Sequence, residues 1–201
     1  GFGGKESQSA LFACIAAVAA RRLGRAVKLR PDRDDDFMIT GRRHGFEFDY
    51  EAGFDDAGCV LGVEVTMITN AGFSADLSPP VMTRAICHFD NAYWLPDVAI
   101  HGYLAKTNTQ SNTAFRGFGG PQGALAIEVI LDEVARVLQR DALEVRRANF
   151  YGTTQRNVTP YGQTIADNVV HALTDELVRS SDYAARRGAV ARFNTTSEVL
   201  K

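Results

Sequence analysis

Alternation of apolar and polar positions marks one stretch of the chain as a long β-hairpin. Phe46, Phe48 and Tyr50 alternate with acidic residues, and a similar alternation returns at residues 63–67 after the turn sequence Asp55-Asp56-Ala57-Gly58. Period-two alternation is typical of a strand with one buried face, and turn residues between two such runs favour an antiparallel pair. The sequence therefore predicts an antiparallel hairpin over these residues.

Helical spacing governs most of the remaining chain. Residues 10–23 form an alanine-rich run, with Ser7 and Ser9 as candidate N-caps and Gly24 as a candidate stop. The longest helix is predicted near residues 122–139, where one buried face is expected from Ile127, Ile130, Val134 and Leu138. Further helices are predicted near residues 78, 141, 167 and 182.

Two glycine-rich stretches, residues 1–6 and 113–123, each lead into a predicted helix. A short strand is predicted at residues 27–29, and another at residues 100–105 feeds the second stretch. Strand, glycine loop and helix units on a mixed sheet indicate the fold class α+β, or mixed α/β. Residues 153–164 are polar and turn-rich, which indicates a linker or a long loop.

Composition narrows the class of protein. Apolar residues make up 45% of the chain and charged residues 23%, which is typical of a globular protein, and the net charge of −2 gives no argument for nucleic acid or membrane as a partner. Three distant cysteines argue against a disulfide framework, an iron–sulfur cluster or a structural zinc in this segment. Buried free thiols in a reducing compartment are expected instead. Because the chain starts within a glycine loop, lacks an initiating Met and ends without a stop signal, we expect part of a larger polypeptide.

Two groups of polar residues invite a metal or acid–base interpretation that their pattern does not favour. Residues 32–36 contain four aspartates, but acids in this position more often precede and stabilise a helix N-terminus. The four histidines, at positions 44, 88, 101 and 171, show no metal-ligand spacing.

The second glycine stretch is the strongest candidate for chemistry. Glycines let a backbone approach a ligand closely, and the helix after residue 121 directs N–H groups to the same place. Arg116 adds a permanent charge and Phe118 a flat face for a ring. Tight turns alone are the structural alternative. A nucleotide site is the other, although neither stretch has the P-loop or dinucleotide-binding spacing. Taken singly, Glu6 could serve only its helix N-terminus, and Arg84 could simply face water.

Four motifs together resemble the molybdenum-cofactor-binding portion of the xanthine dehydrogenase family. They are Gly-Phe-Gly-Gly-Lys-Glu at residues 1–6, the aspartate run at 32–36, Ser-Asn-Thr-Ala-Phe-Arg-Gly-Phe-Gly-Gly-Pro-Gln at 111–122, and Glu-Val-Arg-Arg-Ala-Asn at 144–149. The resemblance covers nearly the whole chain and weakens after about Asn157. It implies that residues 1–152 belong to a first molybdopterin-binding domain, and residues 153–201 to a linker and the start of a second.

The resemblance also implies roles for particular residues. In the first loop Phe2 and Gly3, and in the second Arg116 and Gly117, would contact the molybdopterin cofactor. Phe2 and Arg116 would surround the molybdenum without being side-chain ligands.

Three other residues match the family's purine site. Glu6 would hydrogen-bond the purine, Arg84 would lie at its far end, and Phe118 would stack on its face. Negative charge develops on the ring away from the carbon that is hydroxylated, so a guanidinium at the distal carbonyl would act preferentially in the transition state. Glu6 and Arg84 are therefore the catalytic candidates of this chain.

The family implies xanthine or hypoxanthine as substrate, with 2Fe–2S clusters and FAD elsewhere in a cytoplasmic, dimeric parent enzyme or in its partner subunits. The family's general base lies in a Gly-Glu motif that this sequence lacks, so the chain alone is expected to be inactive. An aldehyde or other N-heterocycle hydroxylase, and a non-catalytic phosphate- or nucleotide-binding module, remain the alternatives.

Overall fold

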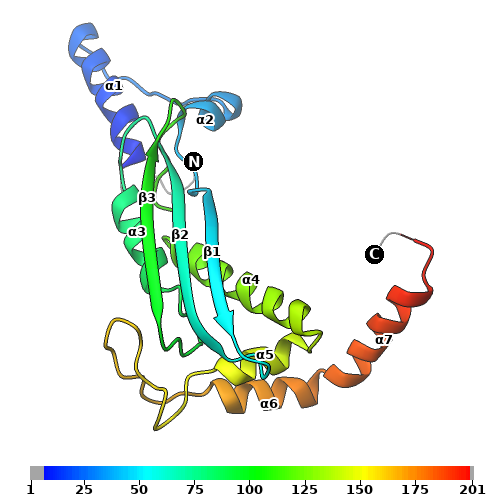
Figure 1. Ribbon diagram of the computed structural model, residues 1–201. Coiled ribbons are helices and arrows are strands. Elements are labelled where there is room, and N and C mark those ends of the chain that lie inside the picture. The colour runs from blue at the N-terminus through cyan, green and yellow to red at the C-terminus, as the bar shows by residue number, and fades with distance from the viewer. Residues whose placement is uncertain (1–6, 200–201) are drawn as a thin grey trace.

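The structure, a computed structural model, describes residues 7–199 of the chain, and a three-stranded mixed sheet lies at its centre (Figure 1). The strands are β1 (Phe46–Phe54), β2 (Val60–Gly72) and β3 (Val98–Lys106), in the order β1-β2-β3. β1 and β2 form the predicted antiparallel hairpin, whereas β3 runs parallel to β2. The hairpin and the mixed sheet predicted from the sequence are thereby confirmed.

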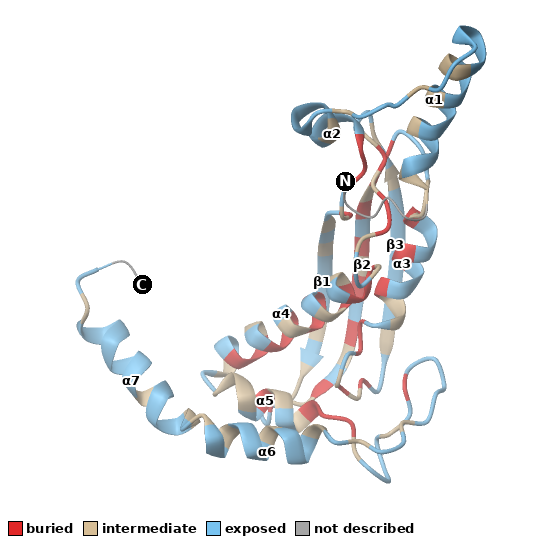
Figure 2. Cartoon of the chain, turned by 180° about the vertical axis from the view of Figure 1, so that it is seen from behind, coloured by how far each residue is buried: buried red, intermediate tan, exposed pale blue. Residues whose placement is uncertain are grey.

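Helices account for most of the other described residues. They are α1 (Gln8–Leu23), α2 (Arg33–Ile39), α3 (Ser78–Cys87), α4 (Gly120–Leu138), α5 (Ala142–Asn149), α6 (Val170–Ser180) and α7 (Tyr183–Thr196). α3 and α4 lie against one face of the sheet, as seen from behind in Figure 2. α1 and α7 extend away from the sheet and contain no buried residue. No helix within residues 7–199 has the length and apolar character of a membrane span.

The hydrophobic core lies between the sheet and α4. β2 contributes Val63, Val65 and Met67 from alternate positions, and α4 contributes Ile127 and Ile130 from one face. Because a strand repeats every two residues and a helix every 3.6, these two local patterns bring the same kind of side chain to one interface. The buried face predicted for the long helix is confirmed, with Val134 buried and Leu138 packed at its edge.

The structure decides three local expectations, which concern a strand, a helix cap and the cysteines. Residues 27–29 form no strand, because they lie apart from the sheet and Leu29 is exposed; that prediction was wrong. Asp32 caps α2 by accepting a hydrogen bond from the Asp35 N–H at 2.9 Å, as the helix-start interpretation required. Residues 7–199 contain no cluster of His, Cys, Asp or Glu suited to a metal. All three cysteines are free, but Cys14 lies exposed on α1 and Cys59 and Cys87 are only half-buried, so the expectation of buried thiols was wrong.

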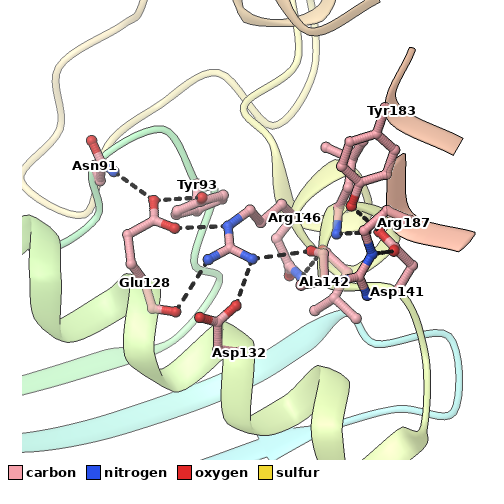
Figure 3. Close-up of polar contacts among 12 residues, drawn as sticks. Asn91, Tyr93, Glu128, Asp132, Asp141, Ala142, Arg146, Tyr183 and Arg187 are labelled. Atoms are coloured by element: carbon pink, nitrogen blue, oxygen red, sulfur yellow. Dashed lines mark hydrogen bonds and ion pairs between the residues drawn. The ribbon is translucent and has the colours of Figure 1, made fainter. Parts of the chain in front are cut away.

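A partly buried ionic network joins α4 to α5 (Figure 3). The Arg146 guanidinium donates to Glu128 Oε2 and to Asp132 Oδ1, each at 2.7 Å. Tyr93 donates its hydroxyl to Glu128 Oε1 at 2.6 Å, and burial together with this carboxylate raises the pKa of the Tyr93 phenol. The carboxylate of Glu128 is thus satisfied on both oxygens, and α5 is fixed to the helix that covers the sheet.

A second polar contact attaches α7 to the start of α5. Asp141 caps α5 by accepting from the Leu143 N–H at 2.8 Å. Its carboxylate also accepts from the Tyr183 hydroxyl at 2.8 Å and from Arg187 Nε at 2.9 Å. One side chain therefore serves both as helix cap and as the anchor of the last helix.

Replacing Arg146 by Met should loosen α5. The change leaves the Glu128 carboxylate with fewer donors at a site where its side chain is only 31% exposed, so local opening of α5 should become easier by about 1–3 kcal/mol. Faster amide hydrogen exchange over residues 142–149 of the parent protein would report it. Arg136→Met is the matched control, because the Arg136–Glu133 ion pair of α4 is solvent-exposed. Loss of that pair should leave the exchange of residues 142–149 unchanged. Equal exchange in the two variants would contradict the prediction.

Candidate functional site

The loop before α4 has an unusual backbone. Gly117, Phe118 and Gly119 all adopt positive φ, at 92°, 53° and 100°. The turn is closed by hydrogen bonds from the Phe118 N–H to the Phe115 carbonyl at 2.8 Å and from the Gly120 N–H to the Gly117 carbonyl at 3.0 Å. A phenylalanine in the left-handed region is strained, and such strain is typically retained at functional positions.

Glycines of this loop also let two backbones touch. A Cβ on Gly119 would lie 2.0 Å from the Val81 carbonyl oxygen, and one on Gly123 would lie 2.1 Å from the Ala85 carbonyl oxygen. The start of α4 therefore packs directly on the backbone of α3, at a distance that no larger residue permits. The structural interpretation of the glycines holds for Gly119 and Gly123. It holds also for Gly117 at the exposed tip, where a Cβ would lie 2.5 Å from Pro121 Cγ.

This contact packs the helix that carries Arg84 against the loop that carries Arg116 and Phe118. Arg84 precedes Ala85 on α3 and is exposed, and Arg116 is exposed on the loop that packs against that helix. Phe118, next to Gly119, is half-buried. Phe2, Gly3 and Glu6 of the first glycine loop lie outside the described residues.

A segment that sequence reasoning overlooked supports the loop from its other side. Residues 41–45, here called the crossing segment, precede β1 and run beside residues 111–116. The Thr113 N–H donates to the Arg42 carbonyl at 3.0 Å. A Cβ on Gly41 would lie 2.2 Å from the Ser111 carbonyl oxygen, so the two chains are in backbone contact here as well.

Two side chains of the crossing segment extend this support. Arg43 stacks on Phe115, with its Cζ 4.1 Å from the ring centroid, and its Nη2 donates to the Arg116 carbonyl. His44 is buried, and its Nε2 lies 2.7 Å from the Ser78 hydroxyl at the start of α3. Burial lowers the pKa of His44, although Asp76 opposes the shift. No local pattern distinguishes Arg43 or His44 from a solvent-facing pair, which is why sequence reasoning missed them.

The polar groups around the loop suit a bound, oxygen- and nitrogen-rich cofactor. Arg43 Nη1 and Gln122 Oε1 are buried and have no hydrogen-bond partner among the described residues. The Gly117 N–H donates no hydrogen bond to another described residue. Buried polar groups are nearly always paired in native proteins, so the buried Arg43 donor and the buried Gln122 acceptor left over near this loop fit a ligand that supplies the missing partners.

The fold of this chain is shared with solved structures. The aldehyde oxidoreductase from Desulfovibrio gigas superposes with a TM-score of 0.79 at 26% identity, over 92% of this chain and 20% of that one. A mixed sheet covered by helices and bordered by a glycine loop is therefore the architecture of a molybdenum hydroxylase domain. The chain belongs to the molybdopterin cofactor-binding domain family, whose profile matches residues 1–150.

Curated relatives agree with this assignment. Xanthine dehydrogenase from Drosophila subobscura is 45% identical over all 201 residues. Nicotinate hydroxylase from Emericella nidulans is 42% identical over 195 residues, or 96% of the chain. The chain spans 15% of the length of the first relative and 14% of the second.

Gly119→Ala should disrupt the site by forcing α3 away from the loop. The added Cβ would lie 2.0 Å from a backbone oxygen, so the destabilisation should exceed the roughly 1–3 kcal/mol that positive φ alone causes. Gly162→Ala is the matched control, because Gly162 also has positive φ, at 86°, but has open space around its Cβ position. Thermal unfolding of the two variant parent proteins measures the difference. Similar unfolding midpoints for the two variants would show that the α3–loop contact does not limit the stability of the protein.

Proposed function

We propose that the parent protein is a molybdenum hydroxylase of the xanthine dehydrogenase type, which converts hypoxanthine and xanthine towards urate. The observation that carries the proposal is the packing of Gly119 on α3, because it places the Arg84 helix against the loop of Arg116 and Phe118. Identity of 45% to a xanthine dehydrogenase along the whole chain supports the same substrate class.

Within this proposal the two glycine loops hold the cofactor. Phe2 and Gly3 of the first loop, and Arg116 and Gly117 of the second, supply its contacts, with Phe2 and Arg116 around the molybdenum. The bound cofactor supplies the hydroxylation chemistry and accepts the electrons. The chain supplies position, because the three successive positive φ angles and the α3 contact leave the second loop little freedom.

Purine recognition falls to three side chains. Phe118 offers a ring face and is itself fixed by a strained backbone. Arg84 stabilises the negative charge that develops at the distal end of the purine, and an exposed guanidinium on α3 is free to meet that charge. Glu6 orients the purine and selects its tautomer through hydrogen bonds.

The rest of the parent enzyme follows from the same family. We infer a division after residue 152, with residues 153–201 as linker and start of a second molybdopterin-binding domain. Residues 153–169, most of them exposed and without helix or strand, support this division. The general base, the 2Fe–2S clusters and FAD belong to the parent outside this chain, and the parent is a cytoplasmic dimer.

Hydroxylation of another N-heterocycle is the second candidate. It is favoured by the 42% identity to a nicotinate hydroxylase, only slightly below the identity to xanthine dehydrogenase. Metal analysis of the parent protein, followed by turnover of xanthine, nicotinate and an aldehyde, decides between the candidates. A parent without molybdenum would sink both.

Arg84→Ala in the parent enzyme should slow xanthine oxidation about 10²- to 10³-fold, by analogy with the loss of one oxyanion donor. Stability should hardly change, because Arg84 is exposed on α3. Steady-state kinetics and thermal unfolding measure the two effects. Arg136→Ala, an exposed arginine of α4, is the control. Near-normal turnover of the Arg84 variant would remove Arg84 from the site.

Glu6→Gln should affect purines more than aldehydes, because only a purine offers ring nitrogens for this side chain to hydrogen-bond. The ratio of kcat/KM for xanthine to that for an aldehyde should fall at least about tenfold, as expected when a polar recognition partner is lost. An unchanged ratio, with both substrates slowed alike, would assign Glu6 a structural role only.

A further inference from the structure

The side chain of Arg43 is placed to control one peptide group of the cofactor loop. Its Nη2 donates to the carbonyl oxygen of Arg116, and its guanidinium lies over the Phe115 ring. The stacking fixes the plane of the guanidinium, and the hydrogen bond fixes the carbonyl. Arg43 comes from the crossing segment, 73 residues earlier in the chain, so the peptide is held from outside the loop.

Holding this carbonyl also sets the direction of the next N–H. The described chain has no cis peptide bond, and in a planar trans peptide the C=O and the following N–H point in opposite directions. With the Arg116 carbonyl directed at Arg43, the Gly117 N–H must face the opposite side. That N–H has no partner among the described residues, and Gly117 lies exposed at the loop tip.

Although the loop as a whole is held against α3, no other hydrogen bond among the described residues opposes a rotation of this one peptide. Gly117, at φ 92°, has no side chain to resist it, and the neighbouring hydrogen bonds use the Phe115 and Gly117 carbonyls, not that of Arg116. Among the described residues Arg43 is therefore the group that fixes the orientation.

Arg42, the residue before Arg43, shows how the contacts of Arg43 differ from those of an ordinary surface arginine. Arg42 makes the same two kinds of contact, because it donates to the Phe37 carbonyl and lies 5.5 Å from the Phe37 ring centroid. Phe37 is exposed on the short helix α2, away from the glycine loop. Arg42 and Arg43 thus form a matched pair with equal chemistry and different targets.

We propose that Arg43 is a positioning residue that directs the Gly117 N–H towards the bound cofactor. The inference rests on the proposed function only in taking the cofactor to lie on the open side of this loop. Arg43 itself touches neither substrate nor cofactor through its Nη2. Losing it would let the Arg116–Gly117 peptide turn over and present a carbonyl oxygen where the cofactor meets a donor.

The test compares Arg43→Met, Arg43→Lys and Arg42→Met in the complete parent enzyme. Molybdenum content, hydrogen exchange over residues 115–119, the Mo(V) paramagnetic resonance spectrum and kcat per bound molybdenum are measured for each. Arg43→Met should lower kcat per molybdenum about 10- to 100-fold, the effect of a misplaced contact, with KM little changed. It should also speed exchange at residues 115–119 and alter the spectrum. Arg42→Met should match the wild type in all four.

Arg43→Lys keeps the inference testable if the Met variant fails to fold. Lysine retains the charge and an apolar stem but cannot both stack flat and donate in a fixed fork, so an intermediate loss of kcat per molybdenum is expected with normal exchange in α3 and α4. A wild-type spectrum and kcat for Arg43→Lys, or for Arg43→Met, would overturn the proposal. Failure of the proposed function differs, because it would appear in the unaltered parent as absent molybdenum or absent purine turnover.

Discussion

The backbone contact between α3 and the start of α4 is the constraint on which the rest of the site depends. Gly119 and Gly123 bring the loop and its helix within van der Waals distance of the carbonyl oxygens of Val81 and Ala85. Any Cβ at these positions would separate the two helices, and with them Arg84 and Phe118. One packing requirement therefore explains why glycines accumulate here and why the helix of Arg84 and the loop of Arg116 and Phe118 form one packed unit.

The crossing segment completes that packed unit from the other side. His44 connects it to Ser78 at the start of α3, and Gln122 of α4 donates to the His44 carbonyl at 3.2 Å. The loop, which leads directly into α4, is consequently contacted by two elements that are distant in sequence, α3 and the crossing segment. The ionic network of Arg146 lies further along α4 and holds that helix to α5. Precision at the loop tip thus rests on contacts along the whole length of α4.

Local sequence patterns predicted much of this fold but few of the long-range contacts that hold the glycine loop in place. The hairpin and the buried face of α4 follow from periodicity within about twenty residues, so the sequence alone was sufficient. Residues 27–29 carry a similar apolar signal but lack a neighbouring strand, and a strand needs a partner that local sequence does not reveal. The contact of Arg43 with Arg116 spans 73 residues and leaves no periodic trace. Arg84, Arg116 and Phe118 were found through the resemblance of whole motifs, whereas spacing left each of them ambiguous.

The net charge of −2 conceals an uneven distribution of acidic and basic residues over the molecule. The sheet face away from α3 and α4 carries alternate acidic positions of β1, and its Glu51 lies directly opposite Glu64 of β2. Arg43, Arg84 and Arg116 belong instead to the glycine loop and to the two segments that pack against it. Since the helices and the core lie between them, the acidic face is separated from the loop by a low-dielectric layer, and its charges remain in contact with solvent that screens them. A chain with a net charge of −2 can therefore still concentrate arginines in one region of its surface.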